Sequence, residues 1–260
     1  MSPSDGPVGV EVAGGVATVT LRRPEVRNAI DDAMRHALVR ALEAVTRDDS
    51  VRVVVLTGEG SAFCAGGDVK AMQRRLSSSI GRVAFDGWRR QRGTAAMIAM
   101  LHDAAPVTIA AVNGPAMGLG MDIALACDFI VAAPEARFGA AFVKRGLIPD
   151  GGGMYFLPRR IGLQRTKELI YSGRAVDADE ALAIGLADRL AASGALLDEV
   201  RAFAEPIVAH SASALALMKS IVNRTFESTL ADVASLGAGA QAISYTTDDH
   251  RSAVEAFLGR

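Results

Sequence analysis

The 260-residue chain carries 28 Lys and Arg against 29 Asp and Glu, a net charge of −1, and half of its residues are hydrophobic. This balance provides no overall positive field for nucleic acid or an anionic membrane surface, and the length suits one large α/β domain or a domain with an appendage. The N-terminal segment has no basic stretch followed by an apolar one, and no run of about 18 apolar residues occurs. We therefore expect a cytoplasmic protein that does not span a membrane.

The first half of the chain alternates strands, glycine loops and helices. Residues 8–12 and 16–21 alternate in polarity about Gly14 and Gly15, which predicts a β-hairpin. Apolar residues at helical spacing predict a helix from Ile30 to Val45, and VRVVVLTG at residues 51–58 predicts a buried strand. A glycine-rich loop and a charged helical stretch over about 69–100 follow.

The same order recurs after Pro106. VTIAAVNG predicts a buried strand, a second glycine-rich turn leads into the helical run MDIALAC, and DFIVAAP predicts another strand. From Gly162 onward the patterns are mostly helical, with only residues 187–190 predicted as extended. We expect an α/β core over residues 1–195 and a helical appendage over 196–260, whose apolar faces pack on the core or on another subunit.

Metal and nucleotide cofactors are not indicated. Cys64 and Cys127 cannot build a disulfide framework and lack the Cys/His spacing of a metal site, so we expect both to be buried. The sequence GLGMDI lacks the third glycine of a dinucleotide-binding turn, and no phosphate-binding GxxxxGK[ST] occurs.

Two glycine turns follow buried strands, SAFCAGGD at residues 61–68 and NGPAMGLGMD at residues 113–122. Such turns present backbone N–H groups outward. If the N–H groups of Gly67 and Leu119 converge, they can donate to one carbonyl oxygen, and a helix beginning near Gly118 adds the positive end of its dipole. This pattern predicts an oxyanion hole built from the main chain.

With these turns, the chain resembles the enoyl-CoA hydratase/isomerase family, or crotonase superfamily. The segments RPEVRNAID, SAFCAGGDVK, PVTIAAVNGPAMGLGMDIALACDFIVA, ARFGAAFVKRGLIPDGGG and LPRRIG follow one another in the family's order. The resemblance implies a spiral of ββα repeats with a C-terminal helical region that makes trimers, often paired into hexamers. It also implies an acyl-CoA substrate and no separate cofactor.

The resemblance also assigns the candidate substrate contacts. The thioester oxygen is expected between the N–H groups of Gly67 and Leu119. The remaining CoA contacts are expected at the backbone of Ala65, the neighbourhood of Asp68 and Val69, and, near the phosphates, Arg27. Residues from about 76 to 100 are expected to border the acyl pocket.

The acidic residues discriminate between reactions. Hydratases of the family carry two glutamates that position and deprotonate water, and the matching positions here hold Asp122 and Phe142. Asp122 is about 1.5 Å shorter than glutamate, and Phe142 cannot move a proton. Efficient hydration by the two-glutamate route is therefore not expected. The alternative for Asp122 is a structural role, because a carboxylate in a first helical turn complements the helix dipole and bonds free N–H groups.

Asp150 lies eight residues after Phe142, in GLIPDGGG. Pro, Asp and Gly are ordinary turn residues, but the motif is similar to those of the phenylacetate-pathway isomerases and the peroxisomal-type Δ3,Δ2-enoyl-CoA isomerases. A single carboxylate in an apolar substrate pocket, near residues such as Phe142 and Leu119, would have a raised pKa and act as a better base. The prediction is an enoyl-CoA isomerase with Asp150 as proton shuttle. The alternatives are a hydratase that uses Asp122 and a catalytically silent acyl-CoA-binding protein.

Overall fold

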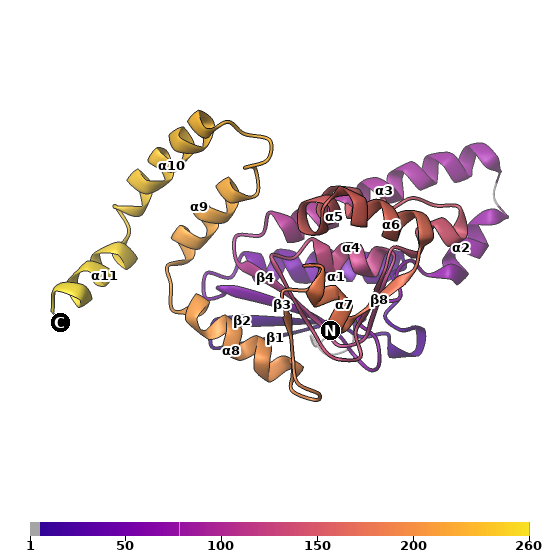
Figure 1. Ribbon diagram of the computed structural model, residues 1–260, viewed down its shortest axis with the longest axis horizontal. Coiled ribbons are helices and arrows are strands. Elements are labelled where there is room, and N and C mark those ends of the chain that lie inside the picture. The colour runs from indigo at the N-terminus through magenta and orange to yellow at the C-terminus, as the bar shows by residue number, and fades with distance from the viewer. Residues whose placement is uncertain (1–5, 78, 260) are drawn as a thin grey trace.

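The computed structural model describes residues 6–77 and 79–259 and has an α/β core with a helical arm (Figure 1). The predicted hairpin is confirmed and forms one side of a six-stranded sheet, whose remaining neighbours are parallel. The strands, in spatial order, are β1 (Val8–Ala13), β2 (Val16–Leu21), β3 (Val53–Gly58), β4 (Val107–Val112), β6 (Phe129–Ala132) and β9 (Arg189–Leu190).

Both faces of this sheet are covered. Successive side chains of a strand point to opposite faces, so each strand contributes to both cores. On β3, Val54 and Leu56 pack in a core with the buried side of α1 (Asp32–Thr46). Val53 and Val55 belong to a second core on the other face, which α8 (Leu196–Val208) covers. This is why the predicted buried strand VRVVVLTG shows no alternation in polarity.

A smaller sheet holds the segments near the glycine turns. It consists of β5 (Pro115–Met117), β7 (Arg137–Gly139) and β8 (Ala175–Asp177). The expectation that only residues 187–190 are extended after Gly162 was wrong, because β8 pairs antiparallel with β7. Strands of three residues are too short to show a periodic pattern, and their pairing depends on partners far away in the chain.

The core contains further helices between its strands. The charged stretch predicted over 69–100 is two helices, because the first ends at Leu76 and the second begins at Ile80. These elements are η1 (Pro24–Val26), α2 (Val69–Leu76), α3 (Ile80–His102), α4 (Leu119–Leu125), η2 (Ala141–Arg145), α5 (Gly153–Ile161), α6 (Leu163–Ser172) and α7 (Ala178–Ala183).

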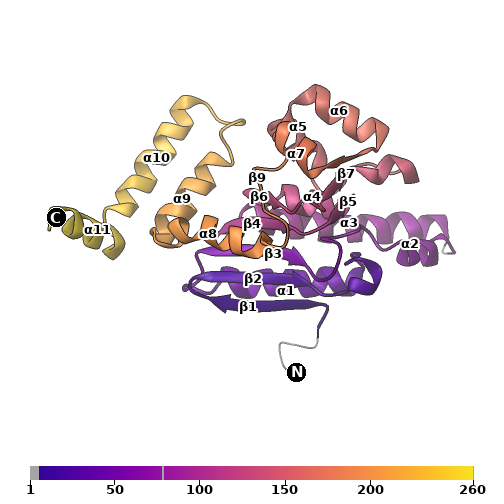
Figure 2. The same ribbon diagram turned by 60° about the horizontal axis from the view of Figure 1, so that its bottom comes forward.

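The C-terminal helices leave the core. α9 (Ala212–Val222) is tied to it by Lys219, whose Nζ lies 2.7 Å from Oδ2 of Asp128. α10 (Leu230–Ser244) and α11 (Asp248–Leu258) extend away from the sheet in both views (Figures 1 and 2). Within the described part of the chain, no side chain of α10 or α11 is buried, and Leu230 and Phe257 are largely exposed. No helix of residues 6–77 and 79–259 is long and apolar enough to cross a membrane.

Candidate active site

The two glycine turns meet. Cys64, in the first turn, pairs with β5: its N–H donates to the carbonyl of Pro115 at 3.0 Å, and its carbonyl accepts from the N–H of Met117 at 2.9 Å. A Cβ at Gly120 would lie 2.2 Å from the Cys64 carbonyl oxygen. Only glycine allows this approach, so Gly120 holds the first turn against the start of α4.

The amides of Gly67 and Leu119 lie at this junction. A Cβ at Gly66 would be 2.5 Å from the carbonyl oxygen of Met117 and 3.4 Å from the Leu119 nitrogen. In the described part of the chain, neither the Gly67 nor the Leu119 N–H has a backbone acceptor. Leu119 is also the first residue of α4, where helical N–H groups have no intrahelical partner. Both amides are thus available to a ligand oxygen.

Asn28 supports the first turn, a role that the sequence reading missed. The residue is fully buried with a φ of 57°. Its Oδ1 accepts from the N–H of Arg23 at 2.9 Å, and its Nδ2 donates to the carbonyls of Glu59 at 3.0 Å and Ala62 at 2.8 Å. Asparagine tolerates the left-handed region better than most residues. The signal available in the sequence was the asparagine itself, in RNAID.

The residues assigned to CoA lie along the outer edge of this turn. Ala65, Val69 and Arg27 are exposed, and the Ala65 N–H donates to the Arg27 carbonyl at 2.8 Å. Asp68 differs, because it is buried and caps α2. Its Oδ1 accepts from the N–H of Ala71 at 3.0 Å.

The carboxylate of Asp68 is therefore already engaged. The Ala71 N–H, together with the guanidinium of Arg23 at 3.3 Å, holds the pKa of Asp68 below its ordinary value despite burial. Its side chain acts as a helix cap and an ion-pair partner.

GLIPDGGG wraps around a buried carboxylate. Oδ2 of Asp122, on α4, accepts the N–H of Gly151 at 3.0 Å. A Cβ at Gly151 would lie 2.8 Å from that oxygen and 2.6 Å from Cδ1 of Leu119, and a Cβ at Gly153 would lie 2.4 Å from Oδ1 of Asp122. The intervening Gly152 has a φ of 93°. The glycines therefore let the loop carrying Asp150 lie directly on α4.

Asp122 serves this loop and is not presented to a ligand. It is 1% exposed, and burial raises its pKa to about 8, which outweighs the N–H groups of Gly151 and Gly153 that favour its charged form; the charge of Asp150 raises it further. The sequence predicted bonds from Asp122 to free N–H groups of its own helix, and this prediction was wrong. The bonded N–H groups belong to the turn across from α4, which sequence proximity could not indicate.

Asp150 and Phe142 complete the cluster. A Cβ at Gly118 would be 3.7 Å from the Phe142 ring, so this buried ring lies beside the start of α4. Asp150 is partly exposed, and partial burial raises its pKa, opposed by its own N–H and by the positive charge of Arg90. The arrangement combines two free amides, apolar walls and one accessible carboxylate, which suits stabilisation of an enolate and movement of a proton.

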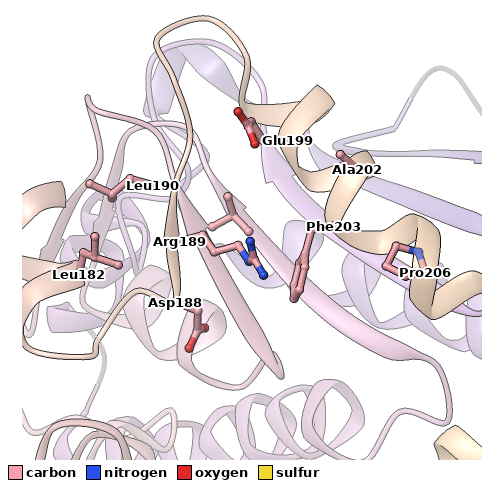
Figure 3. Close-up of a pocket in the computed structure, with 9 residues that line it drawn as sticks. Leu182, Asp188, Arg189, Leu190, Glu199, Ala202, Phe203 and Pro206 are labelled. Carbon is pink, nitrogen blue, oxygen red and sulfur yellow. The ribbon is translucent and has the colours of Figure 1, made fainter.

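One cavity lies outside the candidate site (Figure 3). It has a volume of about 550 Å³ and lies between the β9 edge of the large sheet and α8, where Arg189 stacks on Phe203 with 4.3 Å from Cζ to the ring centroid. None of its lining residues is a candidate site residue. No group of three or more His, Cys, Asp or Glu side chains in residues 6–77 and 79–259 could hold a metal ion.

Comparison with known proteins gives consistent results. The family model described as enoyl-CoA hydratase/isomerase matches residues 11–260. A probable enoyl-CoA hydratase of Rhizobium meliloti (strain 1021) is 36% identical over 253 residues, covering 96% of this chain and 94% of the relative. A 1,2-epoxyphenylacetyl-CoA isomerase of Escherichia coli (strain K12) is 34% identical over 249 residues, covering 96% and 94%.

Solved structures share the whole fold, including the C-terminal helices. The crystal structure of an enoyl-CoA hydratase/isomerase from Cupriavidus metallidurans CH34 superposes with a TM-score of 0.90 at 35% identity. It covers 100% of this chain and 95% of that one. The expected spiral α/β fold is confirmed by this match.

Proposed function

Because this chain belongs to the enoyl-CoA hydratase/isomerase family, we propose that it is an enoyl-CoA isomerase that moves a double bond with Asp150 as its acid-base group. Enzymes of this family act on CoA thioesters without a separate cofactor. The observation that carries the proposal is the different state of the two neighbouring aspartates. Asp122 is buried under the loop with its oxygens against Gly151 and Gly153, whereas Asp150 is accessible.

The proposed reaction uses one base twice. The thioester oxygen of a 3-enoyl-CoA accepts the N–H groups of Gly67 and Leu119, so that negative charge can develop on it. Asp150 removes a proton from C2, and the electrons move into a dienolate spanning the thioester and C2 to C4. The protonated Asp150 then returns the proton to C4, which yields the 2-enoyl-CoA and regenerates the carboxylate.

Phe142 favours this outcome over addition of water. Its ring lies beside the start of α4, and it can neither hold nor deprotonate a water molecule. Exclusion of water protects a reactive intermediate from side reactions. The name of the Escherichia coli relative, a 1,2-epoxyphenylacetyl-CoA isomerase, also lends support to isomerase chemistry.

A direct assay separates the two activities. Purified protein is offered 3-hexenoyl-CoA and, separately, 2-hexenoyl-CoA, and the products are resolved by chromatography. We expect conversion of the first to the conjugated 2-enoyl thioester and little 3-hydroxyacyl-CoA from the second. Rapid hydration with no double-bond migration would overturn the proposal.

Hydration is the second candidate, because relatives such as that of Rhizobium meliloti are named probable enoyl-CoA hydratases. In this case Asp122 would act with a second group, and hydration would disappear in Asp122→Ala but persist in Asp150→Asn. The bonds of Asp122 to the loop argue against this role. Acyl-CoA binding without turnover across chain lengths would indicate the third possibility, a catalytically silent binding protein.

We also propose that the chain forms trimers, alone or paired into hexamers, through residues 196–260. Within that region α8 covers the chain's own sheet, whereas α10 and α11 expose Leu230, Ile243 and Phe257. Apolar surface of this extent is normally covered by another protein surface. Sedimentation velocity at working concentration tests the proposal, and a monomer would contradict it.

A further inference from the structure

Two arginines near the candidate site have no ion-pair partner in the part of the chain that the structure describes. Arg75 on α2 and Arg90 on α3 are both partly buried. Neither guanidinium takes part in an ion pair or hydrogen bond among residues 6–77 and 79–259. Arg35 on α1 also belongs to this basic cluster, but it is paired with Asp32 at 2.7 Å.

Arg90 lies on the face of α3 that packs toward the Asp150 loop. It precedes the buried Thr94 by four residues and the buried Ile98 by eight, so all three share one side of the helix. A Cβ at Gly152 would lie 3.4 Å from Cγ2 of Ile98, so this side of α3 faces the loop that carries Asp150. The Arg90 guanidinium runs back along Gly87, at 3.7 Å from a Cβ placed there. Because Gly87 has no side chain, it leaves room for the Arg90 guanidinium.

The neighbouring arginines of α3 behave differently. Arg89 stacks on Phe85 and Arg92 stacks on Trp88, with Cζ 5.2 and 5.1 Å from the ring centroids. Both aromatic side chains are more than half exposed. Arg89 therefore provides a matched control, because it carries the same charge on the same helix but on the solvent side.

Electrostatics connect the two arginines with each other and with the candidate base. Burial raises the pKa of Asp150, and the charge of Arg90 opposes part of that rise. Burial lowers the pKa of Arg75, and the charge of Arg90 lowers it further. Two guanidiniums in one partly buried site repel each other. The charge of Asp32 raises the pKa of Arg75 and so offsets part of this repulsion, but among residues 6–77 and 79–259 no carboxylate lies within ion-pair distance of Arg75 or Arg90. A bound carboxylate would relieve this repulsion and could accept paired N–H bonds from either fork.

We infer that Arg75 and Arg90 bind a carboxylate at the far end of the acyl group, so that the substrates are ω-carboxyl acyl-CoA thioesters. This inference rests on the proposed function in one respect, because it assumes that the acyl group of the substrate lies beside Asp150. The phosphates of CoA are the other source of an anion. They are expected near Arg27 and Ala65, on the edge of the first glycine turn.

The inference is tested by binding, with saturated acyl-CoA thioesters that cannot undergo double-bond migration. Calorimetry compares hexanoyl-CoA with adipoyl-CoA, its ω-carboxyl counterpart, and repeats the comparison at four and eight carbons. We expect wild type to bind the ω-carboxyl partner of the best-fitting pair at least about tenfold more tightly, or about 1.4 kcal/mol. Because no turnover is needed, this result stands or falls separately from the isomerase assay.

Variants identify the residues responsible. We expect the ratio of the two dissociation constants to fall below about threefold in the Arg75→Gln, Arg90→Gln double variant, to be intermediate in Arg90→Lys, and to keep the wild-type value in Arg89→Gln. Thermal melting verifies that each variant is folded. If the double variant does not fold, Arg90→Lys still tests the inference. A wild type that prefers the neutral partner at every length would overturn the inference. Equal weakening of hexanoyl-CoA, adipoyl-CoA and free CoA would also overturn it, by assigning the arginines to the CoA phosphates.

Discussion

Asp150→Asn is the most direct test of the site. Asparagine keeps nearly the same size and can still lie in the GLIPDGGG turn, but it cannot accept and return a proton. A positioned acid-base group contributes about 10² to 10⁴ in rate, which corresponds to about 2.7 to 5.4 kcal/mol in the barrier. We expect kcat for migration of the 3-hexenoyl-CoA double bond, followed by absorbance of the conjugated thioester, to fall by that factor.

The pH dependence supplies a second signature. Asp150 must be ionised to act as a base, so kcat/KM falls as the pH drops through its pKa. Partial burial raises this pKa above the ordinary aspartate value. The acidic limb of the wild-type profile should therefore lie above about pH 3.9, and it should disappear from the residual activity of Asp150→Asn.

Binding and a distant aspartate provide the controls. The dissociation constant of hexanoyl-CoA should change by less than about threefold in Asp150→Asn, because the proposed reaction places Asp150 at the reacting carbons and not at the CoA moiety. Asp49 is exposed on the surface, and Asp49→Asn should retain full activity. If Asp150→Asn isomerises 3-hexenoyl-CoA within about threefold of wild type, Asp150 is not the proton shuttle.

Three further predictions concern the loop, the buried carboxylate and the arm. Gly153→Ala places a methyl group 2.4 Å from Asp122 and should lower stability by about 1 to 3 kcal/mol in urea unfolding, whereas Gly81→Ala, with no atom within 4 Å, should not destabilise; equal midpoints would refute the contact. The folded-state pKa of Asp122, raised to about 8, means that its proton is held more tightly in the folded state, so its contribution to stability is lost between about pH 4 and 8. Asp122→Asn cannot ionise, and urea midpoints that decline with pH as steeply as in wild type would contradict this assignment. Phe257→Glu puts a charge on the exposed face of α11 and should shift sedimentation toward smaller species, while an unchanged assembly would place the contact elsewhere.

Much of the fold was accessible from local patterns. The hairpin, the strand VRVVVLTG, the strand VTIAAVNG and the helix after Gly118 all appear as predicted, because their periodicity and glycine positions reflect burial within a few residues. The short strands β5, β7 and β8 were not accessible in this way. Three residues carry no period, and these strands exist through pairing with segments that are distant in sequence.

The candidate site also has features that local patterns predict and features that depend on residues distant in sequence. The sequence could indicate two glycine turns with outward amides and could single out Asp150 beside Phe142. It could not show that Asp122, 29 residues away from Gly151, supports the loop and is thereby withdrawn from the ligand. It also gave no sign that Arg90 approaches Asp150, since a charged helix normally presents such residues to solvent.

By itself, the sequence determined the family, the order of strands and turns, and the residue types available for acid-base chemistry. The tertiary structure decided which of two aspartates is accessible and which arginines have no ion-pair partner among residues 6–77 and 79–259. The physical reason is that burial, desolvation and charge pairing depend on atoms brought together across the fold. Asp122 and Asp150 have the same side chain, but Asp122 accepts N–H groups of the loop that lies on α4, whereas Asp150, on that loop, is partly exposed.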